Sequence, residues 1–120
     1  MGYLYVAMGG AFGAVFRYLS MNLIGLSNFP YGTFFVNITG SFLIGMFLSY
    51  ESGVQSLPQE LKLLIVVGFL GAFTTFSTFS MDSIHLIQKS EYFKAIAYVT
   101  GSLALSFSAF IIGMQIFKQS

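Results

Sequence analysis

Four runs of mainly apolar residues take up most of the chain, at about residues 3–24, 32–50, 61–87 and 93–117. As helices, runs of roughly 20 such residues can cross a bilayer core about 30 Å thick. Only 8% of the residues are charged, whereas a soluble domain carries about 25%. We therefore predict an all-α membrane protein in which residues 1–120 form a single domain with four transmembrane helices.

The connections between the runs are short, so any function must lie within or between the spans. A formal net charge of +1 gives no field for a nucleic-acid partner. The chain has no cysteine, and its single histidine has no nucleophile suitably spaced from it. No phosphate-binding loop or metal-ligand spacing occurs either. We predict that the protein is not an enzyme and that its surroundings are the lipid bilayer.

Lysines in the predicted loops do not favour either orientation. Lys62 and Lys118 lie on the side of the termini, and Lys89 and Lys94 lie on the other side. Cytoplasmic loops normally hold the excess of Lys and Arg, so a tie allows both orientations. This predicts an antiparallel, dual-topology dimer. The alternative is that so few charges do not report orientation at all.

The first span carries Gly9, Gly13 and Arg17 at every fourth position, so these residues share one helix face. The small residues permit close approach of another helix. An arginine at membrane depth is costly unless it pairs or reaches the interface. Arg17 either attracts anions at a water-filled mouth, or caps carbonyl groups or stabilises a dimer.

The second span carries a stripe of polar and small residues at every fourth position: Thr33, Asn37, Ser41, Gly45 and Ser49. Such a stripe faces protein or water and not lipid. An amide within a span needs partners, and its NH₂ group can donate twice to an anion. Asn37 is therefore a candidate ligand, with interhelical hydrogen bonding as the alternative.

The third span combines helix-weakening glycines with clustered hydroxyls. Gly68 and Gly71 precede Thr74, Thr75, Ser77, Thr78 and Ser80. Hydroxyls that compete for backbone groups favour a break at mid-membrane. Free carbonyls there suit a cation, and the N-terminus of a half-helix suits an anion. A hydroxyl-mediated kink without any ligand is the alternative.

Phe73, Phe76 and Phe79 follow at every third position and share a face of the third span. Their positive ring edges can meet a partly dehydrated anion, although packing is the more usual role. Further along the span, Thr78, Asp82 and His85 lie near one face. We interpret them as the wall of a hydrated vestibule, with an interfacial hydrogen bond between Asp82 and His85 as the alternative.

The fourth span places Lys94, Tyr98, Ser102, Ser106 and Phe110 at every fourth position. Hydroxyls about one helical turn apart can pass a small anion from donor to donor. Hydrogen bonding between helices would explain each serine singly.

Three motifs in these spans resemble the small four-span fluoride channels called Fluc or CrcB proteins. They are GGAFGAVFRY at residues 9–18, GTFFVNITGSF at 32–42 and GFLGAFTTFSTFS at 68–80. The resemblance covers nearly the whole chain. It implies a multi-pass protein of the bacterial inner membrane, whose antiparallel dimer, with a second copy or a homologous subunit, conducts fluoride passively out of the cell through two pores.

The resemblance also implies roles for particular residues. A structural sodium ion, which is not transported, would be held at the dimer centre by the backbone carbonyls of Gly71 and Thr74. The residues implied for the fluoride path are Asn37, Phe76, Phe79, Ser77, Thr78, Tyr98, Ser102 and Ser106, with Arg17 at the vestibule. Asp82 stands where the family more often has glutamate.

The alternative from another class is a small proton-coupled multidrug exporter, also with four spans and dual topology. Such an exporter needs a carboxylate within its first span, and this chain has Arg17 and no acid there. A structural subunit without transport would leave the polar stripes on three spans without a purpose.

Overall fold

The computed structural model describes residues 1–25, 29–53 and 57–117, and these residues form helices and turns without any strand. The elements are α1 (Gly2–Ile24), α2 (Tyr31–Gly53), α3 (Gln59–Lys62), the π-helix η1 (Leu63–Leu70), α4 (Gly71–Phe73), α5 (Phe76–Gln88) and α6 (Tyr92–Gln115). Four stretches are long and apolar enough to cross a membrane: Gly2–Ile24, Tyr31–Glu51, Gln59–Gln88 and Tyr92–Gln115. The predicted all-α class and the four spans are confirmed.

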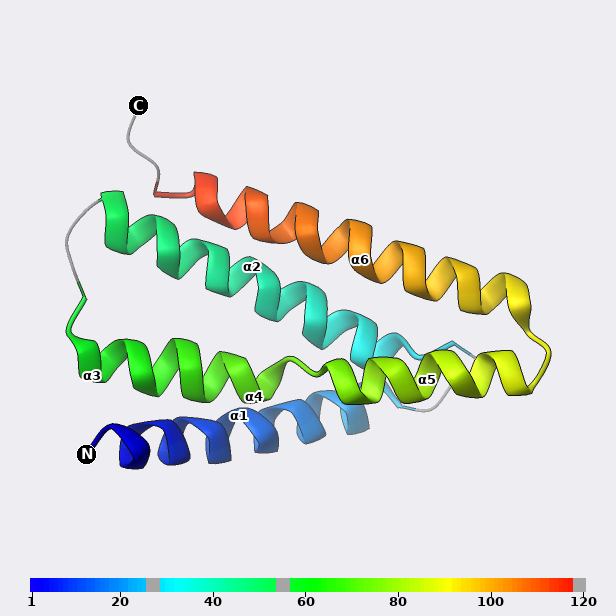
Figure 1. The fold of residues 1–120 in the computed structure, drawn as a ribbon, viewed down its shortest axis with the longest axis horizontal. Coiled ribbons are helices and arrows are strands. Elements are labelled where there is room, and N and C mark those ends of the chain that lie inside the picture. The colour runs from blue at the N-terminus through cyan, green and yellow to red at the C-terminus, as the bar shows by residue number, and fades with distance from the viewer. Residues whose placement is uncertain (26–28, 54–56, 118–120) are drawn as a thin grey trace.

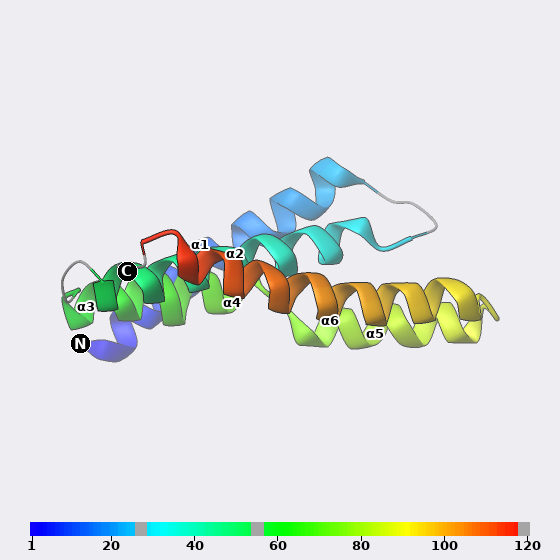
Figure 2. The ribbon, with the colours of Figure 1, turned by 90° about the horizontal axis from the view of Figure 1, so that it is seen from above.

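The helices form a flat assembly (Figure 1), with α2 beside α6 and with α1 beside η1 and α4. The principal extents are 49 × 36 × 20 Å, so the assembly is about two helices thick. Figure 2 shows α1 crossing the other helices at an angle, while α5 lies next to α6. Few large apolar side chains in the described part are therefore buried, and most are left to meet lipid or another protein chain.

The two ends of the assembly carry different lysines. The start of α1, the α3 helix with Lys62 and the end of α6 lie at one end, and the turn between α5 and α6 lies at the other (Figure 1). Lys89 directly follows α5, and Lys94 lies in the first turn of α6. Lys118, the fourth lysine of the predicted tie, lies outside the described residues.

Glycines on α1 allow it to lie directly against the backbone of η1. A methyl group added at Gly9 would overlap the carbonyl oxygen of Leu64, and one added at Gly13 would overlap that of Phe69. Both glycines are buried. The predicted small-residue face of the first span is thus a helix-packing surface.

A second close crossing joins α2 and α6 through a reciprocal pair of glycines. A methyl group at Gly45 would overlap the carbonyl oxygen of Phe110, and one at Gly113 would overlap that of Phe42. Near the end of the pair, the N–H of Phe117 donates to Oγ of Ser49 at 2.8 Å. These contacts hold the polar stripes of α2 and α6 against each other.

The backbone leaves the helical region between α4 and α5. Thr74 has φ −83° and ψ 154°, and Thr75 has φ −150° and ψ 119°. Upstream, η1 is wound as a π-helix over eight residues, a rare conformation found frequently at functional sites. The Thr74–Thr75 segment lies beside α2, where Asn37 bonds to the backbone of Thr75.

Candidate functional site: a groove beside Thr74 and Thr75

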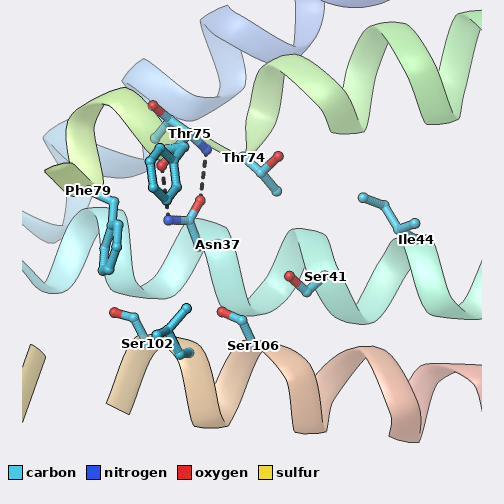
Figure 3. Close-up of a pocket in the computed structure, with 10 residues that line it drawn as sticks. Asn37, Ser41, Ile44, Thr74, Thr75, Phe79, Ser102 and Ser106 are labelled. Atoms are coloured by element: carbon cyan, nitrogen blue, oxygen red, sulfur yellow. Dashed lines mark hydrogen bonds between the residues drawn. The ribbon is translucent and has the colours of Figure 1, made fainter. Parts of the chain in front are cut away.

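A groove of about 240 Å³ opens where α2, the Thr74–Thr75 segment, α5 and α6 meet (Figure 3). Its lining residues come from all four parts of the chain: Asn37, Ser41, Ile44, Thr74, Thr75, Phe76, Phe79, Ser102, Leu103 and Ser106. Amide, hydroxyl and phenyl groups line it together with two aliphatic side chains, and no formally charged group contributes to the wall.

Asn37 holds the extended backbone at Thr75. Its Nδ2 donates to the carbonyl oxygen of Thr75 at 3.1 Å, and the N–H of Thr75 donates to its Oδ1 at 2.8 Å (Figure 3). The side-chain amide replaces helical partners that the Thr75 backbone does not have. Asn37 therefore fixes the groove wall. One N–H of its NH₂ group takes no part in these two hydrogen bonds.

The Thr75 side chain caps the start of α5. Its Oγ1 accepts from the N–H of Thr78 at 3.2 Å and lies 3.3 Å from Oγ1 of Thr78 and 3.2 Å from Oγ of Ser77. An N-cap threonine usually accepts a hydrogen bond from a backbone N–H of the first helical turn in this way. Ser77 and Thr78 are thereby joined to the cap, and neither lines the groove.

Several carbonyl groups lose their usual helical donors at this segment. In a continuous helix the N–H of Thr75 would bond to the carbonyl of Gly71, and that of Thr78 to the carbonyl of Thr74. Here the first N–H bonds to Asn37 and the second bonds to the Thr75 side chain. The carbonyls set free from the helical ladder include those of Gly71 and Thr74, the residues implied as sodium ligands, and that of Ala72, which accepts from Arg17.

Arg17 reaches the same segment from α1. Its Nη1 donates to the carbonyl oxygen of Ala72 at 2.8 Å, across 55 positions of sequence. A guanidinium at the C-terminal end of a helix satisfies a free carbonyl and complements the helix dipole. Arg17 lines neither the groove nor a second cavity, of about 370 Å³, whose walls include Asp82 and His85.

Aromatic rings continue from the groove into the protein. The centroids of Phe76 and Phe79 are 5.6 Å apart, and those of Phe79 and Tyr98 are 5.3 Å apart. Phe76 is 75% exposed in the single chain, whereas Tyr98 is fully buried. Phe76 therefore has room to meet a further molecule or a second protein chain, and Phe79 is held by Tyr98.

Ser102 has the most unusual environment in the groove. The residue is 5% exposed, and its Oγ is buried without a hydrogen-bond partner among the described residues. An unmade hydrogen bond of a buried hydroxyl costs about 1–3 kcal/mol. One helical turn on, Ser106 also lines the groove, and Ser41 approaches from α2 (Figure 3). The groove thus has hydroxyls that are available to a ligand.

Tyr98 lies behind the groove and not in its wall. Its hydroxyl donates to Oδ2 of Asp82 at 3.1 Å. Among the residues implied for the fluoride path, Asn37, Phe76, Phe79, Ser102 and Ser106 line the groove, whereas Ser77, Thr78 and Tyr98 stand behind it. The predicted path did not include Ser41, although its place in the α2 stripe was a usable signal.

Four apolar helices, with a groove between them that is lined by phenyl, aliphatic, amide and hydroxyl groups, define a multi-pass membrane protein. A model of the CrcB-like protein family, Camphor Resistance (CrcB), matches residues 4–114. The chain belongs to this family, as its three motifs indicate.

Close relatives carry the name fluoride-specific ion channel FluC. The chain is 46% identical to that of Nitrobacter winogradskyi, with 96% of this chain and 94% of the relative covered. It is 43% identical to that of a Hydrogenobaculum species, with 94% of both chains covered. These names denote ion channels and not enzymes, as expected for this chain, and give no support to the exporter alternative.

Proposed function

We propose that this protein is a fluoride-selective channel that conducts fluoride passively, down its electrochemical gradient and out of the cell. The observation that carries the proposal is the buried, unpartnered hydroxyl of Ser102 in a groove bounded by phenyl rings and the Asn37 amide. The names of the relatives support the choice of ion.

The chemistry of the groove suits a small, strongly hydrated anion. A pore must replace the water around such an ion with several weak donors, so that the ion enters and also leaves. Hydroxyls, an amide N–H and the positive edges of phenyl rings are donors of this kind. A formal positive charge in the wall would hold the anion more tightly, and the lining residues include none.

The working unit in this proposal is an antiparallel dimer in the bacterial inner membrane, formed with a second copy or a homologous subunit. The exposed Phe76 ring and the thin, flat shape of the single chain support a partner against this face. The third span is interrupted at mid-membrane, and the second copy closes the open side of each groove. Two pores result, one along each copy.

A structural sodium ion between the two copies belongs to the same proposal. The donor set fits, because backbone carbonyl oxygens are ligands that hard cations accept. Gly71 and Thr74 of each copy would hold the ion, since their carbonyls have lost the usual helical donors. When bound, the ion neutralises these carbonyl dipoles and ties the two interrupted spans together.

The test is fluoride efflux from liposomes that contain the purified protein. We expect fluoride to leave much faster than from protein-free vesicles, and chloride to leave at the rate of protein-free vesicles. The proposal would be overturned if fluoride left the protein-containing vesicles no faster than it leaves protein-free vesicles. Chemical crosslinking of the reconstituted protein and accessibility of a single introduced cysteine from both faces would test the antiparallel dimer.

A further inference from the structure

The side chain of Thr74 fills a hollow that Gly40 leaves in the surface of α2. Gly40 is buried, and a methyl group added there would overlap Cγ2 of Thr74. The next atoms around the added methyl are Cδ2 of Phe73 at 3.4 Å and Cβ of Thr74 at 3.7 Å, both tolerable distances. A side chain at position 40 would therefore compete for space with one methyl group, that of Thr74.

This close approach differs from those at other glycines. At Gly13 and Gly113 the added methyl would overlap a backbone carbonyl of the neighbouring helix. At Gly71, whose carbonyl is a proposed cation ligand, the nearest atom would be the carbonyl oxygen of Val66 at 3.7 Å, an ordinary contact. Packing within the single chain therefore requires a glycine at position 40, beside the interruption of the third span, and does not require one at position 71.

Thr74 cannot turn out of the hollow without losing a hydrogen bond. Its Oγ1 donates to the carbonyl oxygen of Leu70 at 3.0 Å, and its backbone N–H donates to the same oxygen at 3.1 Å. A β-branched side chain has few rotamers, so the position of Oγ1 also fixes that of the methyl group. The two branches of Thr74 are thus held together, one by Leu70 and the other by the hollow at Gly40.

Asn37 holds the next residue of the chain from the same face of α2. Asn37 and Gly40 are three positions apart, so they lie on one side of the helix. Asn37 accepts from the N–H of Thr75, and this N–H belongs to the same planar peptide unit as the carbonyl of Thr74. That carbonyl has lost its usual helical donor. The peptide unit is therefore fixed at its N–H by Asn37 and at its other end by the seat of the Thr74 side chain.

We infer that Gly40 is a positioning residue of the proposed sodium site: by receiving the Thr74 methyl, it fixes the direction of the Thr74 carbonyl. The inference rests on the sodium site of the proposed function and adds a residue that does not line the groove. A metal ligand binds more tightly when neighbouring groups hold it in place, and loss of such support typically costs about 10–100-fold in metal affinity. A larger residue at position 40 would displace Thr74 and weaken sodium binding.

The test measures sodium binding apart from fluoride conduction. Purified protein in detergent, free of fluoride, is titrated with sodium chloride against choline chloride at constant ionic strength. The unfolding temperature and the crosslinked dimer fraction both report binding. We expect Gly40→Ala to raise the sodium concentration for half the maximal effect at least about tenfold. Gly10→Ala is the matched control, because its methyl would come no closer than 3.9 Å to the Gly68 carbonyl oxygen, and it should keep the wild-type value.

A second substitution, at Thr74, should restore the site. Thr74→Ser removes Cγ2 and keeps the Oγ1 that bonds to Leu70. In the double variant with Gly40→Ala, the closest remaining contact of the added methyl is Phe73 at 3.4 Å. We expect Thr74→Ser alone to raise the half-maximal sodium concentration about threefold, because the hollow is then empty, and the double variant to lie within about threefold of wild type.

These measurements separate positioning from packing. If Gly40→Ala lowers the unfolding temperature in choline chloride but keeps the wild-type sodium concentration, the Thr74 side chain has turned aside and the inference is overturned. A double variant that needs as much sodium as Gly40→Ala would overturn it as well, because the two methyl groups would then not compete. If Gly40→Ala does not fold, Thr74→Ser decides: a threefold rise supports the inference, and the wild-type concentration refutes it.

Failure of the proposed function is visible separately. If neither the unfolding temperature nor the dimer fraction of the wild-type protein responds to sodium, the proposed sodium site fails, and the role of Gly40 with it. Fluoride efflux from liposomes made with the same preparations tests the channel independently. A wild-type protein that responds to sodium but conducts no fluoride would refute the channel, and the sodium titrations of the variants would still decide the role of Gly40.

Discussion

Asn37 on α2 and Thr75 between α4 and α5 exchange two hydrogen bonds, although they are 38 positions apart in the sequence. One side chain thereby satisfies both backbone groups of a residue that lies outside any helix. The same N–H bond that joins Thr75 to Asn37 leaves the carbonyl of Gly71 without its helical donor. The groove wall and one of the proposed cation ligands, the Gly71 carbonyl, thus depend on a single amide side chain.

Asn37→Asp should therefore damage both the fold and the flux. A carboxylate accepts from the Thr75 N–H but cannot donate to the Thr75 carbonyl, and it brings a negative charge to an anion path. We expect a loss of about 1–3 kcal/mol in stability and fluoride efflux near that of protein-free vesicles. Thermal unfolding in detergent and efflux from liposomes measure the two effects. Thr39→Val on the same helix, outside the groove lining, is the control.

Phe76→Ile and Phe79→Ile test the phenyl rings, because isoleucine keeps the apolar character but has no positive ring edge. We expect each change to lower fluoride efflux at least about tenfold. Phe93→Ile serves as the control, since Phe93 is exposed at the start of α6 and does not line the groove.

The two phenylalanines should differ in stability. Phe79 packs on buried Tyr98, whereas Phe76 is largely exposed in the single chain. Phe79→Ile should lower the unfolding temperature of a monomeric preparation, and Phe76→Ile should leave it unchanged. If both variants conduct fluoride at the wild-type rate, at normal protein content per vesicle, the two phenyl rings are not needed for conduction.

Gly10 and Gly13 provide a matched pair on α1. A methyl group at Gly13 would overlap the Phe69 carbonyl, whereas one at Gly10 would come no closer than 3.9 Å to the Gly68 carbonyl oxygen. Gly13→Ala should push α1 away from η1 and cost about 1–3 kcal/mol, as overpacking does. Gly10→Ala should be neutral or gain up to about 1 kcal/mol from helix propensity. Equal unfolding temperatures for the two variants would contradict the close approach of α1.

The sequence predicts the spans and the facing stripes because hydropathy and fourth-residue spacing are local signals. Thr33, Asn37 and Ser41 on α2 and Ser102 and Ser106 on α6 do line the groove or cavity walls. The partner of Asn37 had no such signal, because specific hydrogen bonds between distant segments depend on tertiary packing. The π-helix of η1 was not predicted either, since an unbroken apolar run suits α and π windings equally.

Ser102→Ala separates function from stability most sharply. The Ser102 hydroxyl is buried and has no partner in the described chain, so its removal breaks no intramolecular hydrogen bond. Stability should stay constant or rise by up to about 1 kcal/mol, because a desolvated donor disappears. Fluoride efflux should fall severalfold, since the ion loses a donor beside Phe79. Ser83→Ala is the contrasting control: its hydroxyl donates to the carbonyl of Phe79 at 2.8 Å, away from the groove lining. A Ser102→Ala protein that is less stable yet conducts normally would show that this hydroxyl serves the fold and not the ion.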